Sequence, residues 1–160
     1  MKVLMLDIDG VLNSMENIYG KPQQRLLIDG VLSPKWTGID YDAVHILNSI
    51  IEQSQCQVVL SSDWRIKIGV ADTLATMRAA GYKYDFFGRT NSIGLRGIEI
   101  LDWIKNWNEN QQDPITHWAV LDDDDDDCKL VAVEDHLVFV SGTFGLMQIH
   151  VPQVLRLLGA

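Results

Sequence analysis

The sequence contains little cysteine and little proline, and it has no long hydrophobic run. Its two cysteines, Cys56 and Cys128, lie outside any C-x-x-C pair, so we expect two reduced thiols rather than a disulfide framework or a zinc site. Only four prolines accompany 47% hydrophobic residues, which excludes a disordered, proline-rich chain. No apolar stretch approaches the roughly 20 residues that a membrane-spanning helix needs. These absences predict a cytoplasmic, folded protein of one domain, for which 160 residues are an ordinary size.

Positive charge is also scarce. The chain has 13 Lys and Arg against 22 Asp and Glu, which gives a formal net charge of −9. Six of the acids form the run from Asp122 to Asp127, so the rest of the chain carries only −3. Because there is no basic stripe, we expect no stable binding to a nucleic-acid duplex. A phosphorylated small molecule, or one phosphorylated end of a strand, stays open as a partner. The sequence does not specify an oligomeric state.

Short apolar strands alternate with amphipathic helices along the chain. Strands of the buried type are predicted over 2–6, 57–61, 116–122 and 136–141, and a short strand or extended segment over 82–88. Helices are predicted over 41–55, 70–81, 96–110 and 151–159. Strands that alternate with helices pack as a parallel sheet covered by helices, so the pattern predicts an α/β fold.

Local signals refine these helices. Asp40 can cap the first helix, and Gly81 can close the second. In the third helix, apolar side chains recur at helical spacing, and we expect them to form its buried face: Ile98, Leu101, Ile104 and Trp107.

Residues 14–40 interrupt the alternation, since a connection between a strand and the next helix is normally only a few residues long. Within them, "RLLI" precedes and "VLS" follows an Asp29-Gly30 pair, which is a strong signal for a two-residue hairpin turn. We predict a small hairpin that lies as a flap over the end of the first strand. It is too short to be a domain, so we expect residues 1–160 to form a single domain without a full cap.

Polar side chains follow the predicted strands where each strand ends. The carboxyl ends of parallel strands meet at one edge of a sheet, where ligands bind. We therefore expect these residues to converge there: Asp7 and Asp9, Ser61 and Ser62, and Asp122 and Asp123. Arg96 stands at the start of the helix that leads into the third of these strands.

These residue types suit phosphoryl transfer. Asp7 and Asp9 are two residues apart, so in an extended chain both carboxylates point the same way. Two carboxylates held close together repel, and a divalent cation removes the conflict while it orients a phosphate. One carboxylate can attack phosphorus, and the other can protonate the leaving oxygen and later activate water. Hydroxyl and guanidinium groups nearby would stabilise the charge of the transition state.

The motifs "DIDGVLN", "VVLSS" and "WAVLDDDDDD", in this order, resemble the signature of phosphatases of the haloacid dehalogenase (HAD) superfamily. With Arg96 as the basic residue, the resemblance spans residues 3–127. "LSSDWR" and "RGIEILDWI" further resemble a small-cap branch found alone or attached to RNA-repair proteins. The resemblance implies a three-layer, Rossmann-like fold, Mg²⁺ as cofactor, and hydrolysis of phosphate monoesters. Within that class it favours nucleotides or nucleic-acid ends, as for a 5′- or 3′-nucleotidase.

The resemblance also implies catalytic roles. Asp7 is then the nucleophile and a metal ligand, and Asp9 is the general acid and base and binds metal through its backbone carbonyl. Ser61 binds the phosphoryl group. Arg96 balances the charge of Asp7 and the phosphate, in a position where lysine is commoner.

In the acidic run, the resemblance makes Asp123 a direct metal ligand, with Asp122 helping directly or through water. A further acid is expected a few residues on, and Asp127 and Asp126 fit this place almost equally well. The later acids of the run can also be solvated surface charge.

Several residues have more than one candidate role. Lys67, Arg65 and Arg89 compete with Arg96 for the basic role. Candidate substrate contacts, besides Ser61, are Ser62, Arg65 and Trp36, the last being the tryptophan of the flap. Trp64 follows a buried strand and is expected to belong to the core.

Other functions compete with hydrolysis. A receiver-like signalling domain also gathers acids at strand ends, but there the phosphorylated aspartate ends a central strand, whereas Ser61 ends the second strand here. A protein phosphatase of the same fold would use the same residues on a phosphorylated side chain. An inactive binding module would keep the fold without the chemistry.

Overall fold

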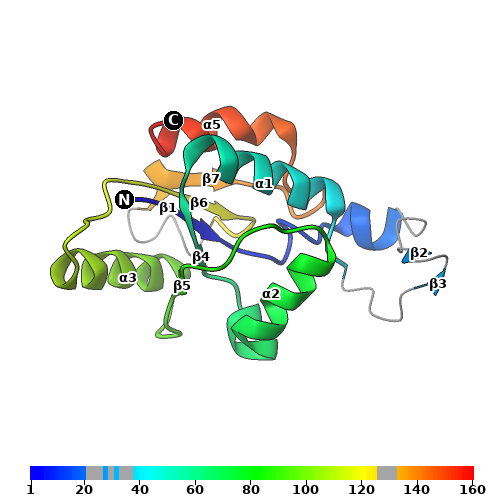
Figure 1. Cartoon of the computed structure of the whole chain (residues 1–160), viewed down its shortest axis with the longest axis horizontal. Coiled ribbons are helices and arrows are strands. Elements are labelled where there is room, and N and C mark those ends of the chain that lie inside the picture. Colours follow the sequence, from blue (N-terminus) through cyan, green and yellow to red (C-terminus); the bar gives the residue numbers. More distant parts are fainter. Residues whose placement is uncertain (21–26, 29–30, 33–37, 126–132) are drawn as a thin grey trace.

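A computed structural model describes residues 1–20, 27–28, 31–32, 38–125 and 133–160 (Figure 1). Six residues singled out in the sequence lie outside these ranges: Asp29 and Gly30 of the predicted turn, Trp36, Asp126, Asp127 and Cys128. Within the described ranges, no helix combines the length and the apolar character that crossing a membrane requires.

The centre of the molecule is a five-stranded parallel sheet in the order β5-β4-β1-β6-β7. Its strands are β1 (Lys2–Leu6), β4 (Gln57–Leu60), β5 (Gly88–Arg89), β6 (His117–Asp122) and β7 (Leu137–Phe139). Three of the four apolar runs that predicted buried strands form the middle of the sheet (β4, β1 and β6), where both faces are covered, and the fourth forms the edge strand β7. Of the predicted segment 82–88, only its last residue belongs to a strand.

Helices cover both faces of the sheet, so the predicted three-layer α/β fold is confirmed (Figure 1). They are α1 (Tyr41–Ser54), α2 (Val70–Ala79), α3 (Arg96–Asn110) and α5 (Val151–Leu157). Four short helical turns complete the fold. Two are π-helical, Glu16–Gly20 after β1 and Arg65–Gly69 before α2, and two are 3-10, Glu134–His136 before β7 and Gln148–His150 before α5. Asp40 caps α1 as predicted, because its carboxylate accepts a hydrogen bond from the Asp42 amide at 2.8 Å.

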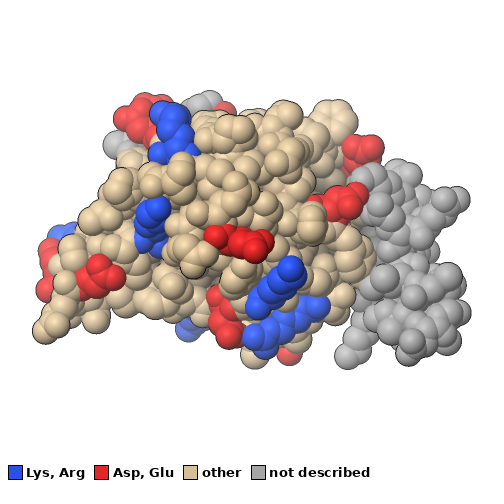
Figure 2. Space-filling model, turned by 45° about the horizontal axis from the view of Figure 1, so that its top comes forward, with Lys and Arg blue, Asp and Glu red and all other residues tan. Residues whose placement is uncertain are grey.

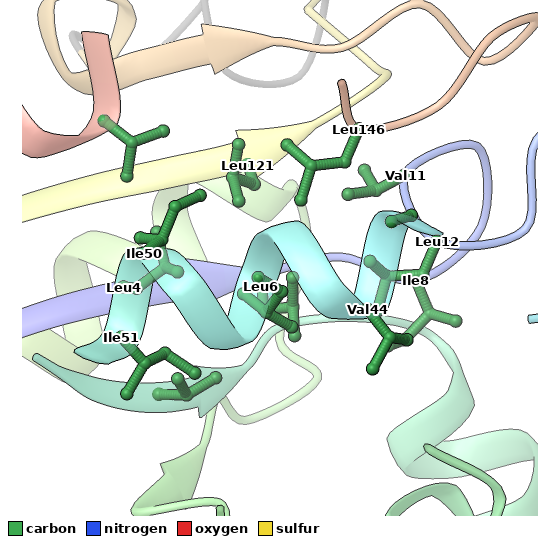
Figure 3. Packing of buried hydrophobic residues seen from close by; sticks show 14 of the residues in the cluster. Leu4, Leu6, Ile8, Val11, Leu12, Val44, Ile50, Ile51, Leu121 and Leu146 are labelled. Carbon is green, nitrogen blue, oxygen red and sulfur yellow. The ribbon is translucent and has the colours of Figure 1, made fainter. Parts of the chain in front are cut away.

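Side chains of β1 alternate between two core layers. Leu4 and Leu6 pack with α1 and α5, together with Val44 and Ile50 (Figure 3). Val3 and Met5 point to the opposite face and pack in a second cluster with Ile100 of α3, partly buried Trp103 and neighbouring residues. This alternation follows from the two-residue period of a strand, and it fixes which strand-end side chains face which layer.

The predicted buried face of α3 is wrong in part. Ile98 and Leu101 are 43% and 36% exposed, whereas Glu99 and Ile100 are buried. Glu99 is buried against Arg65, whose guanidinium forms a salt bridge with its carboxylate. A contact with a residue 34 positions away therefore decides which side of the helix faces inward.

Within the inserted segment, β2 (Leu27–Ile28) pairs antiparallel with β3 (Val31–Leu32), and Ile28 is opposite Val31. This pairing is the predicted hairpin about a two-residue connection. The start of the insertion is fixed to the loop that follows β7: the Met15 and Glu16 amides donate to the Gly142 and Thr143 carbonyls at 3.0 and 2.9 Å.

Candidate active site

Arg96 and Asp7 meet where α3 begins and β1 ends. Arg96 Nη1 donates to Asp7 Oδ1 at 3.0 Å and lies 3.5 Å from Asp122 Oδ2. Asp7 is only 4% exposed, so this guanidinium balances a carboxylate that water hardly reaches. Of the other cations considered, Lys67 lies 3.9 Å from Asp9 with its side chain 62% exposed, and Arg89 is on the edge strand β5.

Three carboxylates gather at the ends of β1 and β6. Asp7, Asp122 and Asp123 each offer an oxygen, and these atoms lie within 4.8 Å of one another. Asp122 is 2% exposed, and its Oδ2 has no hydrogen-bond partner among the described residues. Unmatched carboxylate oxygens that face one another in a buried place fit an oxygen-binding divalent cation such as Mg²⁺.

Two glycines make the space that Asp123 occupies. A Cβ atom at Gly10 or at Gly142 would overlap the Asp123 carboxylate. Gly10 also has a positive φ of 73°, a conformation that side chains other than glycine rarely adopt. The glycine of "DIDG" therefore serves both the turn after the first two acids and the position of a third acid from another strand.

Burial raises the pKa of all three clustered carboxyls. The pKa of Asp122 rises to about 7 because of burial and then the nearby charge of Asp7. Burial raises the pKa of Asp7 against the opposing effect of Arg96, and burial followed by the charge of Asp7 raises the pKa of Asp123. Burial lowers the pKa of Arg96, but the charges of Asp7 and Asp122 outweigh it and raise that pKa. The negative charges of the three carboxylates are therefore unfavourable in the metal-free site, and a bound cation would offset them.

The two serines after β4 differ in their surroundings. The Ser62 side chain lies near enough to Asp7 to lower the pKa of that carboxyl, against the larger rise that burial causes. The Ser61 hydroxyl is fully buried without a hydrogen-bond partner in the described part of the chain, and its amide donates to the Leu6 carbonyl at 2.9 Å. The sequence favoured Ser61 as the phosphoryl-binding hydroxyl, whereas the structure brings Ser62 to the predicted nucleophile.

Arg65 lies beneath the site rather than at its opening. Its five N–H groups have five acceptors, of which four are backbone carbonyls and one is a carboxylate: Ser61, Ser62, Thr90, Asn91 and Glu99. The residue is 3% exposed. A guanidinium with every donor in use has none left for a substrate, so Arg65 is placed to hold the loop after β4 and not to contact a ligand as the sequence suggested.

The carboxylate of Asp9 is not one of the three clustered acids, and its Oδ1 is held by Trp64 and Asn13. Its Oδ1 accepts from Trp64 Nε1 at 2.8 Å and from Asn13 Nδ2 at 2.7 Å. Neither donor was predicted from the sequence. Asn13 stands four residues after Asp9 in "DGVLN", a spacing that a tight turn can close, but Trp64 is 55 residues away and no local pattern marks it.

A cavity of about 390 Å³ opens beside Asp9 and Asp123. Its other walls include the apolar side chain of Met15 and the polar residues Asn13 and Thr143. The cavity therefore offers space next to the acids, with both polar and apolar side chains in its walls.

Comparison with known proteins gives a match that covers most of the chain. A family model described as "HAD domain in Swiss Army Knife RNA repair proteins" matches residues 3–151. The match extends from β1 to the start of α5 and includes every described residue of the site. No curated protein and no solved structure matches the chain significantly.

Proposed function

The chain belongs to the family of HAD domains in Swiss Army Knife RNA repair proteins, and from this premise we propose that it is a Mg²⁺-dependent phosphomonoesterase acting through an aspartyl-phosphate. Family membership supports a phosphatase of the HAD type in general. The observation that carries the specific proposal is the buried group formed by Asp7, its 3.0 Å partner Arg96, and the facing acids Asp122 and Asp123. It combines a nucleophile, a fixed cation and ligands for a metal.

In the proposed mechanism, the Asp7 carboxylate attacks phosphorus and displaces the ester oxygen. Arg96 and Ser62 lie beside Asp7 and stabilise charge on the phosphoryl oxygens. Asp9 protonates the leaving oxygen, and later takes a proton from the water that hydrolyses the aspartyl-phosphate. Mg²⁺ held by Asp7, Asp122 and Asp123, with the Asp9 carbonyl, would supply charge against the phosphate and orient it.

We further propose that the substrates are nucleotides or phosphorylated nucleic-acid ends. The cavity beside Asp9 has room for the body of the leaving group. The segment between β1 and α1, of which the structure describes the β2–β3 hairpin and the two ends, is too short for a full cap domain, which suits a substrate that extends outward. On the face shown in Figure 2, acidic and basic side chains are scattered among uncharged ones in the described part of the surface. Together with the formal net charge of −9 for the whole chain, this favours recognition of an end over capture of a duplex.

The proposal is tested with a generic aryl phosphate in the presence of Mg²⁺. We expect turnover that EDTA abolishes and that Asp7→Asn reduces by several orders of magnitude. Undiminished turnover by Asp7→Asn would contradict the assignment of the nucleophile. Stable, stoichiometric phosphorylation without turnover would instead identify a receiver-like domain.

The substrate class is tested with nucleoside monophosphates and with 3′- and 5′-phosphorylated oligonucleotides. We expect at least one nucleotide class to have a higher kcat/KM than sugar phosphates or phosphopeptides. A preference for phosphopeptides would favour a protein phosphatase of the same fold.

A further inference from the structure

One oxygen of the Asp9 carboxylate is saturated by hydrogen bonds, and the other is not. Trp64 Nε1 and Asn13 Nδ2 both donate to Oδ1, at 2.8 and 2.7 Å. Oδ2 has Lys67 Nζ at 3.9 Å, which is beyond hydrogen-bond distance. A carboxylate oxygen has two lone pairs in its plane, so two N–H donors leave Oδ1 no place for a proton.

Both donors are themselves held in place. The Oδ1 atom of Asn13 accepts a hydrogen bond from the Gly10 backbone amide at 2.8 Å, and its Nδ2 donates to Asp9. Both polar atoms of the Asn13 side chain are therefore fixed by hydrogen bonds. The Trp64 ring is partly buried against the main core cluster, and the Trp64 amide donates to Ser62 Oγ at 3.4 Å. Trp64 therefore contacts Asp9 through its side chain and the serine beside Asp7 through its backbone.

We propose that Trp64, assisted by Asn13, is a positioning residue that turns Oδ2 of Asp9 toward the leaving oxygen of the substrate. This inference rests on the proposed function, because it assumes that Asp9 is the proton donor. Both lone pairs of Oδ1 accept hydrogen bonds from Trp64 and Asn13, so Oδ1 cannot also hold the proton that Asp9 gives to the leaving oxygen. Oδ2 is therefore the oxygen that carries this proton and later takes one from water.

The proton on Asp9 Oδ2 moves together with the phosphoryl group. As the bond from the Asp7 carboxylate to phosphorus forms, the bond from phosphorus to the ester oxygen breaks, and this proton passes to that oxygen. An alcohol leaves, and the enzyme retains an acyl phosphate on Asp7 and a carboxylate on Asp9. Water then attacks phosphorus and gives one proton to Asp9 Oδ2. The bond between the Asp7 oxygen and phosphorus breaks, so inorganic phosphate leaves and the Asp7 carboxylate is regenerated.

The leaving group distinguishes positioning of a proton donor from a general structural role. p-Nitrophenolate is stable enough to leave without protonation, whereas an alkoxide is not. In Trp64→Phe the ring remains and the N–H is lost. We expect its kcat/KM to fall about threefold or less for p-nitrophenyl phosphate, but about 10- to 100-fold for alkyl phosphates. This loss is smaller than most of the roughly 10²- to 10⁴-fold that general acid catalysis contributes, because the proton donor is misplaced and not removed.

The matched control is Trp118→Phe. Trp118 is stacked on His136 and packs in the second core cluster, so the same substitution there should change kcat/KM for all leaving groups alike. Circular dichroism and thermal unfolding show whether each variant is folded. If Trp64→Phe does not fold, Asn13→Ala decides, because it removes the second donor from the same oxygen and should show the same selectivity.

An equal loss for p-nitrophenyl and alkyl phosphates in the folded variant would overturn the inference. Failure of the proposed function looks different, since the unmodified protein would then hydrolyse none of these esters, or Asp7→Asn would keep its activity. The two failures are therefore distinguishable in one set of assays.

Discussion

At the scale of single residues, the site depends on which charges are balanced inside the protein. The Asp7 carboxylate is paired with Arg96 at 3.0 Å. The Oδ2 atom of Asp122 lies 3.5 Å from the same guanidinium and has no hydrogen bond within the described residues. Removing Arg96 would leave a nearly buried carboxylate without its partner, which is more costly than removing an exposed cation.

Arg96→Ala and Lys67→Ala separate these cases. We expect Arg96→Ala to lower kcat at least about 100-fold, as for loss of one group that stabilises transition-state charge. Lys67→Ala should lower it several times less, because Lys67 is 62% exposed and contacts Asp9 only at 3.9 Å. Steady-state kinetics with Mg²⁺ measure both; a larger loss in Lys67→Ala would show that the basic role belongs to Lys67.

The raised pKa of Asp122 predicts how stability depends on pH. Its pKa is about 7 in the folded chain and about 3.9 when unfolded, so the folded state binds more protons between these values. The free energy of unfolding of the metal-free protein should therefore fall as pH rises from about 4 to about 7. Urea unfolding at several pH values in EDTA measures this trend.

Asp122→Asn is the control for that trend. It removes the titrating group, so the decline toward pH 7 should become shallower. Saturating Mg²⁺ should also offset the decline in the unmodified protein, since a ligand that binds only the folded state stabilises it. An unchanged slope in Asp122→Asn would assign the trend to other groups.

At the scale of elements, the strands and helices were largely predictable, because apolar runs and helical spacing are local. The buried face of α3 was not, because it is set by the pair of Arg65 and Glu99 across 34 residues. The acids of the site were predictable from strand ends. Trp64 was not, since its role arises from a contact 55 residues away, and the choice between Ser61 and Ser62 depends on the side-chain direction where a strand ends.

The Arg65–Glu99 pair also joins the loop after β4 to α3, and both of these carry residues of the site. Breaking the pair should therefore weaken several contacts at once. We expect Arg65→Met to lower the free energy of unfolding by roughly 3–5 kcal/mol, because Glu99 and four carbonyls lose a buried partner. Urea denaturation provides the measurement.

An exposed pair is the matched control. Arg78 and Asp85 lie 2.6 Å apart with side chains 51% and 76% exposed, so Arg78→Met should cost less than about 1 kcal/mol. Similar losses in the two variants would mean that the Arg65 network contributes no more than surface charge.

At the scale of the whole molecule, the acids come from β1 and β6, but the space around Asp123 is completed by the loop after β7. Gly142→Ala places a methyl group against the Asp123 carboxylate. We expect the variant to bind Mg²⁺ at least about tenfold more weakly, as for displaced metal-site geometry, which isothermal titration calorimetry measures.

Gly81→Ala is a control for the effect of replacing a glycine. Gly81 has a positive φ of 93° and no atom near its missing Cβ, so the substitution should lower stability without changing Mg²⁺ affinity. Equal weakening in both variants would place the effect of Gly142→Ala in general destabilisation.

The loop after β7 has a consequence for how the protein is made. Every acid and the arginine of the described site lie in the first 123 residues, yet Gly142 and Thr143 hold the root of the insertion, and Gly142 also borders Asp123. On the ribosome, a nascent chain would therefore carry these side chains well before it could hold a metal ion in place. We therefore expect phosphatase activity to begin only after the segment beyond β7 has emerged and docked.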